Sequence, residues 1–206
     1  MKKNRRTKAF TLIELLTVIA IIGVLAALLF PAIKSALVKA ETTKAQAAIS
    51  GLSTAFRSYY TEYGKWPAAE TVASTPTILV STKLIGLLKG DDINFTFGPG
   101  TDANGPSVTY NGNPRHITFL EFKAADLTVS GTTTNFVDPW KRIYLCRFNS
   151  AYDNQIPNPF LPYGPPPANV VTAGFLTWSD GPDGQEDTGG DAPSPSTLNK
   201  DNVKSW

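Results

Sequence analysis

The chain has 206 residues, a net charge of +2 and an apolar fraction of 42%, which suits one membrane segment and one modest globular domain. Five Lys or Arg and no acid occupy the first nine residues, so the remainder holds 14 basic against 17 acidic residues. That mildly acidic remainder excludes a broad basic face for nucleic acid. A single Cys and a single His exclude an intrachain disulfide and a Cys/His zinc cluster.

The first predicted element is a membrane-spanning helix over residues 10–30. This stretch, FTLIELLTVIAIIGVLAALLF, has 21 residues with one charge, about the length that spans ~30 Å of hydrocarbon. The basic leader stays in the cytoplasm by the positive-inside bias, so the rest of the chain lies across the membrane. An ordinary secretory signal peptide is the alternative, with small residues such as Ala36 or Ala40 offering a later cleavage site.

Glu14 argues against an ordinary signal peptide. A carboxylate inside an apolar segment costs roughly 2.5 to 3.5 kcal/mol on insertion scales, so it needs a partner. Cleavage between Ala9 and Phe10 creates a new α-amino cation four residues before Glu14. Within one helix these two groups share a face, and between staggered chains Glu14 of one subunit can neutralise the amine of the next.

The run KAFTLIELL, residues 8–16, resembles the prepilin processing motif of type IV pilins and type II secretion pseudopilins. The resemblance implies that a membrane-embedded prepilin peptidase cuts before Phe10 and methylates the new amine. It also implies that Glu14 is needed for assembly. Ala9 stands where the family usually has Gly, which is a small replacement.

An amphipathic helix is predicted to follow over residues 31–64. Its apolar or small residues recur at helical spacing, at Ile33, Leu37, Ala40, Ala47, Leu52, Ala55, Phe56, Tyr59 and Tyr63. The helical stretch 10–63 would be roughly 80 Å long at 1.5 Å per residue. We expect Pro31 to cause a local kink or a melted turn in this helix, and Gly64 to end it.

Four aromatic residues gather where this helix ends: Tyr59, Tyr60, Tyr63 and Trp66. Packing of the helix end against a sheet is the favoured interpretation. A stacking platform for sugars or bases is the alternative.

Short apolar runs in a Thr-, Gly- and Pro-rich background predict a head of several antiparallel strands over residues 65–206. The runs are 77–80, 93–97, 117–122 and 143–148, and 77–88 is a helix or a strand. The predicted fold class is α+β, with a long N-terminal helix packed on a small antiparallel β-sheet head, as in pilins. The domains are therefore a basic leader (1–9), a transmembrane and assembly helix (10–30), a stalk helix (31–64) and an extracytoplasmic head (65–206).

Three stretches of the head resemble the major pseudopilin, the general secretion pathway protein G family. They are Asp138-Pro139-Trp140 followed by Tyr144, the loop SDGPDG at 179–184, and the Trp-ended tail DNVKSW at 201–206. The chain departs from that family in its long 72–135 segment, in its proline-rich 157–167 segment and in Lys141-Arg142 within the first stretch.

An acidic, glycine-containing loop at 179–201 is a candidate calcium site. Its candidate ligands are Asp180, Asp183, Asp187, Asp191 and Asp201. Calcium takes six to eight oxygen ligands from carboxylates, carbonyls and water, which such a loop can supply, although the spacing differs from an EF-hand. A solvated acidic loop is the alternative, and the family resemblance favours the metal.

No catalytic function is expected. Cys146 lies in a run that reads as a buried strand, and there is no nucleophile elbow, Walker loop or HExxH motif. A glycosidase-like carboxylate pair stays open, because its spacing is a property of the fold.

The resemblance implies a structural subunit of a type II secretion pseudopilus that forms a helical homo-oligomeric fibre. Its implied partners are the prepilin peptidase and methyltransferase, an inner-membrane assembly platform and other pseudopilins. The protein would cross the inner membrane once, with its head in the periplasm. A type IV pilus subunit for adhesion, motility or DNA uptake is the alternative.

Overall fold

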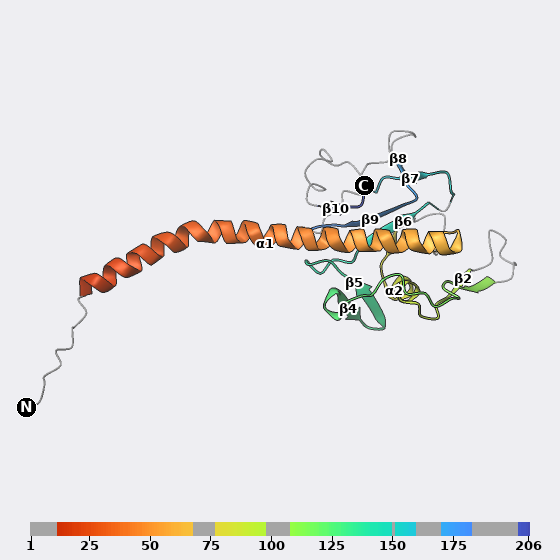
Figure 1. The fold of residues 1–206 in the computed structure, drawn as a ribbon, viewed down its shortest axis with the longest axis horizontal. Helices are drawn as coiled ribbons and strands as arrows, with labels where there is room; N and C mark the ends of the chain where they lie inside the picture. Colours follow the sequence, from red (N-terminus) through yellow and green to blue (C-terminus); the bar gives the residue numbers. More distant parts are fainter. Residues whose placement is uncertain (1–11, 68–76, 98–107, 150, 160–169, 183–201) are drawn as a thin grey trace, which may run out of the picture. The chain divides into compact units, whose positions relative to one another are not determined.

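The computed structural model describes residues 12–67, 77–97, 108–149, 151–159, 170–182 and 202–206 (Figure 1). The chain divides into two compact units, Met1–Ala40 and Glu41–Trp206. The first helix belongs to both units, and the described strands all lie in the second, which we call the head.

Helix α1, Leu12–Tyr63, is 52 residues long and continues through Pro31. A melted turn at Pro31 is therefore wrong, and a local kink there stays a prediction. A proline removes one helical hydrogen bond, and the turns on either side keep theirs. The helix ends as expected, because Gly64 adopts a left-handed φ of 67° and its N–H donates to the Tyr60 carbonyl at 2.8 Å.

The half of α1 that belongs to the head buries one stripe of side chains. The buried residues recur every three or four positions, at Ala45, Ile49, Leu52, Ala55, Phe56 and Tyr59. They form one hydrophobic core with α2, Thr82–Lys89, and with side chains of the central sheet such as Cys146 and Phe148. The amphipathic character is confirmed for the predicted stripe from Leu52 onward, because Leu52, Ala55, Phe56 and Tyr59 are buried. The earlier members of the predicted stripe are exposed: Ile33, Leu37, Ala40 and Ala47.

The central sheet has four antiparallel strands in the order β1-β6-β9-β10. The strands are β1 (Ile78–Leu79), β6 (Leu145–Phe148), β9 (Phe175–Ser179) and β10 (Val203–Lys204). Figure 1 shows α1 lying along β6 and β9 in the head. The predicted α+β class, a long helix packed on a small antiparallel sheet, is confirmed.

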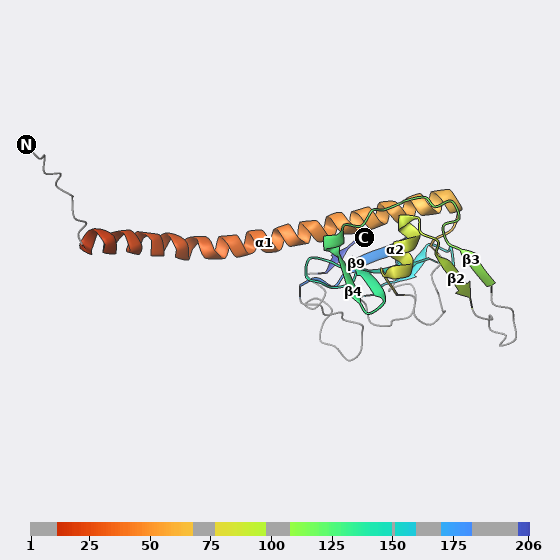
Figure 2. The ribbon, with the colours of Figure 1, turned by 90° about the horizontal axis from the view of Figure 1, so that it is seen from below.

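Three two-stranded ribbons and a short helical turn complete the head. The ribbons are β2 (Asn94–Phe97) with β3 (Val108–Asn111), β4 (Leu127–Ser130) with β5 (Thr133–Phe136), and β7 (Gln155–Pro157) with β8 (Val170–Thr172). The 3₁₀ turn is η1, Ala124–Asp126. Figure 2 shows the β2–β3 ribbon beyond α2, on the side of the head where α1 ends.

Three of the predicted apolar runs contain strands, namely β1, β2 and β6. The prediction of a strand at 117–122 is wrong. The backbone N–H groups of Phe119 and Leu120 both donate to the Leu88 carbonyl, at 2.8 and 3.1 Å, and join no ladder. Phe119, Leu120 and Phe122 pack on the core from this irregular segment. Burial therefore explains the apolar run without a strand.

Asn113 is a fully buried polar residue that ties three segments together. Its Oδ1 accepts from the Tyr63 hydroxyl at 2.6 Å and from the Ile117 N–H at 3.1 Å. Its Nδ2 donates to the carbonyls of Leu87 at 2.8 Å and Ile117 at 2.7 Å. The end of α1, helix α2 and the 113–117 turn thus share one amide whose hydrogen-bonding capacity is filled.

Candidate functional site

The amino-terminal half of α1 exposes an almost continuous apolar surface. Exposed large side chains run from Leu12, at 82%, to Val38, at 52%, and include Ile13, Leu16, Ile22, Leu25, Leu29 and Phe30. By length and composition, α1 is the one helix of the described residues able to cross a membrane. A surface of this kind requires lipid or other protein around it.

Glu14 is the acidic residue in the first turn of α1. A carboxylate there is favourably placed relative to the helix dipole. The Thr17 hydroxyl donates to the Glu14 backbone carbonyl at 3.0 Å. Ala9 and Phe10 lie outside the described residues, so the pairing of Glu14 with a Phe10 amine stays a prediction.

In the head, the carboxylate of Asp138 is 2% exposed and sits at the centre of a hydrogen-bonded cluster. Its Oδ1 accepts from the backbone N–H groups of Trp140 and Arg142, both at 2.9 Å. The Ser179 hydroxyl donates to its Oδ2, and the Gly181 N–H donates to that same hydroxyl at 3.2 Å. Two stretches that are 41 residues apart in sequence, DPW and SDG, therefore contact each other.

The DPW stretch itself is a tight turn joined to α1. The Lys141 N–H donates to the Asp138 carbonyl at 3.0 Å, which places Pro139 at the second position of the turn, where its fixed φ is suited. Lys141 has a φ of 70°, a conformation that favours glycine. The Trp140 indole N–H donates to Glu41 Oε2 at 2.9 Å and so fastens the turn to the helix.

The C-terminal tail reaches the same end of the sheet. Val203 pairs with Ser179 in the β9–β10 ladder, and the Ser205 N–H donates to the Thr177 carbonyl at 3.0 Å. The rings of Trp206 and Trp178 meet edge to face with centroids 6.2 Å apart. The three stretches that resemble the major pseudopilin thus converge, which we call the DPW–tail cluster (residues 138–144, 179–181 and 202–206).

Comparison with known proteins finds similarity in the amino-terminal part of the chain. Residues 4–30 match the family described as the prokaryotic N-terminal methylation motif. A type IV major pilin protein of Neisseria gonorrhoeae is 43% identical over 77 residues, or 36% of this chain and 47% of the relative. A fimbrial protein of Neisseria meningitidis is 40% identical over 74 residues, covering 36% and 44%.

The amino-terminal third of the chain is type IV pilin-like. A type IV major alpha-pilin of Moraxella bovis is also similar, at 43% identity over 68 residues, or 33% of this chain and 42% of the relative. The chain spans less than half the length of each of these curated relatives. No solved structure matches it.

The calcium candidates of the pilin-like protein lie mostly outside the described residues. Asp183, Asp187, Asp191 and Asp201 are outside, and Asp180 is half-buried directly after β9. The described residues hold no group of three or more metal-capable side chains. The β9–β10 pairing does bring residues 180 and 202 together, which closes the intervening acidic loop, and its carboxylates suit a hard cation. The calcium site stays a prediction.

Cys146 is fully buried in β6, as its sequence context predicted. Burial raises the pKa of its thiol well above the ordinary range. A neutral, inaccessible thiol does not act as a nucleophile. The environment of Cys146 is therefore that of a core residue.

Proposed function

We propose that this pilin-like protein is a structural subunit that is cut before Phe10 and polymerises into a fibre through the amino-terminal half of α1. The observation that carries the proposal is the exposed apolar surface of residues 12–38, which contains Glu14 and overlaps the methylation motif at 4–30. Before assembly this segment would span the inner membrane, with the head in the periplasm.

Polymerisation would exchange lipid for the same segment of neighbouring subunits. Both environments are apolar, so the exchange leaves the side chains buried and needs a specific polar contact to set the stagger. Glu14 is the one acidic residue in 10–30. Pairing its carboxylate with the methylated Phe10 amine of the next subunit would neutralise both charges in an apolar core.

For the machine that this fibre serves, we propose a type II secretion pseudopilus. The DPW–tail cluster supports it, because the stretches that resemble the major pseudopilin form one hydrogen-bonded unit around Asp138 and do not lie scattered over the head. The implied partners are a prepilin peptidase with methyltransferase activity, an inner-membrane assembly platform and other pseudopilins.

A type IV pilus subunit is the second candidate. The similar proteins from Neisseria and Moraxella are named as type IV pilins, which favours a pilus for adhesion, motility or DNA uptake. Deleting the gene discriminates the two machines. Loss of extracellular proteins with surface fibres retained supports the pseudopilus, whereas loss of surface fibres with secretion intact supports the pilus.

We also propose that the acidic loop binds one calcium ion, with Asp183 the strongest candidate ligand, followed by Asp187, Asp191 and Asp201, and with Asp180 at its start. The ion would offset the repulsion among these carboxylates and hold the tail against β9. Asn202 and Val203 directly follow the loop, so ordering of the loop and of β10 would be coupled.

The cleavage step is tested by intact-mass and N-terminal analysis of protein taken from membranes. The expected mature chain begins at a methylated Phe10. Ala9→Gly restores the residue usual in the motif and is expected to be processed at least as efficiently. A mature chain beginning near Leu37 or Glu41 would instead show an ordinary signal peptide and remove the basis of the assembly proposal.

A further inference from the structure

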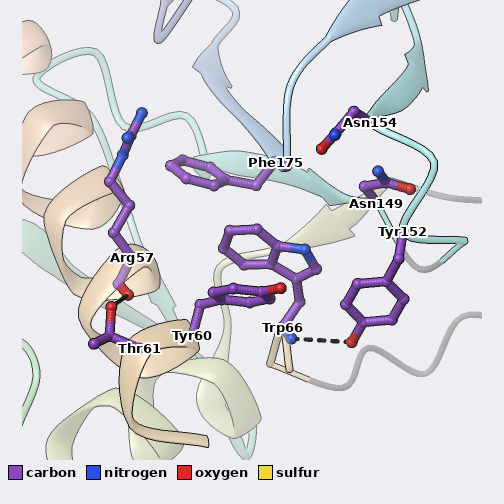
Figure 3. A pocket seen from close by; sticks show the side chains of 9 residues that line it. Arg57, Tyr60, Thr61, Trp66, Asn149, Tyr152, Asn154 and Phe175 are labelled. Carbon is purple, nitrogen blue, oxygen red and sulfur yellow. Dashed lines mark hydrogen bonds between the residues drawn. The ribbon is translucent and has the colours of Figure 1, made fainter. Parts of the chain in front are cut away.

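The head contains an open cavity of about 600 Å³, a size typical of small-ligand sites (Figure 3). Three segments distant in sequence line it. Arg57 and Tyr60 come from α1, Asn149 and Tyr152 come from the segment after β6, and Phe175 begins β9. No residue of the DPW–tail cluster lines the cavity, so the proposed assembly role does not account for it.

Two of the four aromatic residues at the end of α1 line the cavity, and the other two do not. Tyr59 and Tyr63 pack in or against the core, as the favoured interpretation expected. Tyr60 and Trp66 line the cavity, stacked with ring centroids 4.3 Å apart at 29°. Tyr60 is 37% exposed, so part of its surface remains open to a ligand.

Gly174 allows Trp66 to occupy this place. A Cβ added at Gly174 would lie 2.3 Å from Cζ2 of the Trp66 ring, far closer than atoms can approach. The indole also has Phe148 at 6.2 Å and Phe175 at 5.4 Å between ring centroids. Trp66 is thus fixed, and Figure 3 shows its indole nitrogen on the side of the ring nearest Asn149 and Asn154.

Asn149 is a buried polar residue in the lining of the cavity. The residue is 3% exposed, and its Oδ1 is buried with no hydrogen-bond partner among the described residues. A buried polar atom without a partner is costly, so the Asn149 amide would gain from turning its oxygen toward a ligand in the cavity that the residue lines. The Trp66 indole N–H and the amide of Asn154 lie on the same side of the cavity.

The backbone of the segment after β6 is strained where it faces the cavity. Tyr152 has a φ of 56° and Asn154 a φ of 59°. Asparagine tolerates this region, but a bulky ring seldom adopts it, and such conformations concentrate at ligand sites. This backbone conformation positions the Tyr152 ring, which is 52% exposed. The Tyr152 hydroxyl oxygen accepts from the backbone N–H of Trp66 at 3.4 Å.

Arg57 is the one charged side chain among the described residues that line the cavity. Its guanidinium lies 5.6 Å from the centroid of the Phe175 ring. A guanidinium fork recognises a carboxylate through two parallel hydrogen bonds. With no acid in the lining, the cavity favours a negatively charged ligand over a positively charged one.

We propose that this cavity binds a saccharide that carries a carboxylate, such as a uronic acid unit. Its C–H faces would pack on the open surfaces of Tyr60 and Tyr152, and its carboxylate would meet Arg57. Hydroxyl groups both donate and accept, which matches the amides of Asn149 and Asn154 in the cavity lining and the indole N–H of Trp66. A flat aromatic ligand fits less well, because Tyr60 and Phe148 already lie against the Trp66 ring.

The test uses the full chain in a sugar-free detergent, with its four tryptophans labelled with ¹⁵N, and digalacturonate as the probe. We expect saturable movement of one indole N–H resonance, assigned to Trp66 by its loss in Trp66→Phe. Lactose, a neutral disaccharide, should bind about tenfold more weakly, because it lacks a charge-assisted hydrogen bond.

Matched variants decide whether the binding is at this cavity. Arg57→Gln should weaken digalacturonate binding about tenfold and remove the preference over lactose. Asn149→Asp keeps the side-chain size and should weaken acidic sugars further by repulsion. Lys123→Gln removes a charge from an exposed residue outside the cavity and should change nothing.

Three results would overturn the proposal. The first is a Trp66 resonance that neither sugar moves at millimolar concentration. The second is equal binding of both sugars that Arg57→Gln leaves unchanged. The third is movement with an aromatic peptide and with no saccharide, which would make the cavity a peptide site.

Discussion

The two halves of α1 show how one helix presents two different surfaces. Between Leu12 and Val38 the large apolar side chains are 46% to 82% exposed and lie all round the helix. In the head half, Ala45, Ile49, Leu52, Phe56 and Tyr59 are at most 3% exposed and form a stripe. A helix apolar on every side belongs in a membrane or among other helices, whereas a striped helix belongs on a globular core.

The difference shows where each half obtains its stability. The striped half is satisfied within the described head, by α2 and the central sheet. The amino-terminal half is 0% buried over its most apolar window, so none of the described residues covers it there. Substitutions in the two halves should therefore affect different measurements.

The largest expected effect is the loss of assembly in Glu14→Leu. Removing the carboxylate should ease membrane insertion by roughly 2.5 to 3.5 kcal/mol and abolish incorporation into fibres, because the Phe10 amine of the neighbouring subunit loses its partner. Glu14→Ala should behave alike, and Glu14→Lys should be worse, since it brings two cations together. Cross-linking of subunits in cells measures assembly, and a normal oligomer ladder from Glu14→Leu would refute the pairing.

A matched pair of leucines tests the comparison directly. Leu52 is fully buried and Leu25 is 54% exposed. Leu52→Ala should lower the free energy of unfolding of the head by about 2 to 5 kcal/mol, through lost burial and the cavity left behind. Leu25→Ala should leave it unchanged. Urea unfolding of the full chain in detergent, followed by tryptophan fluorescence, measures both changes. Equal effects would contradict the conclusion that only the head half of α1 stabilises the head.

Calcium should raise the stability of the head and leave the amino-terminal half of α1 unaffected. A fragment that begins at Lys34 keeps the whole compact head and should gain about 2.7 kcal/mol of stability at a hundredfold excess of calcium over its Kd. Chelator should reverse the gain. Asp183→Ala should abolish this dependence, and Glu121→Ala, an exposed acid outside the loop, should keep it. A melting temperature indifferent to calcium and chelator would leave a solvated acidic turn.

The smallest expected effect is an alkaline loss of stability from Cys146 and Tyr144. Burial raises the pKa of both groups in the folded head, and for Tyr144 the nearby Asp138 and Asp126 add to it. The stability these groups confer is full below their unfolded pKa values and falls as pH rises through the folded ones. From about pH 8.5 the Cys146 thiol should cost about 1.4 kcal/mol per pH unit, and from about pH 10 the Tyr144 hydroxyl adds its own loss.

Variants separate the two groups in that alkaline loss. Cys146→Ala should remove the part that begins near the ordinary thiol pKa, and Tyr144→Phe the part above about pH 10. Denaturant titrations at a series of pH values measure both. An unchanged pH profile in Cys146→Ala would show that the thiol does not titrate with unfolding.

The sequence alone determined the features that depend on neighbours along the chain. The length and apolarity of 10–30, the basic leader, the place of Glu14 and the stop at Gly64 are local properties, and so is the stripe of the second half. Strands β1, β2 and β6 were visible as apolar runs. The expected melted turn failed at Pro31, where the helical neighbours outweigh one missing hydrogen bond. The expected strand failed at 117–122, where apolar residues are buried without strand pairing.

Only the tertiary structure decided which distant residues meet. Asp138 with Ser179, the tail with β9, and Asn113 with Tyr63 and Leu87 are contacts between segments tens of residues apart. The same holds for the cavity, where Arg57, Asn149 and Phe175 converge and Tyr60 separates from Tyr59. Such contacts depend on how the helix and sheet pack to bury the core, and residue spacing along the chain carries little information about that packing.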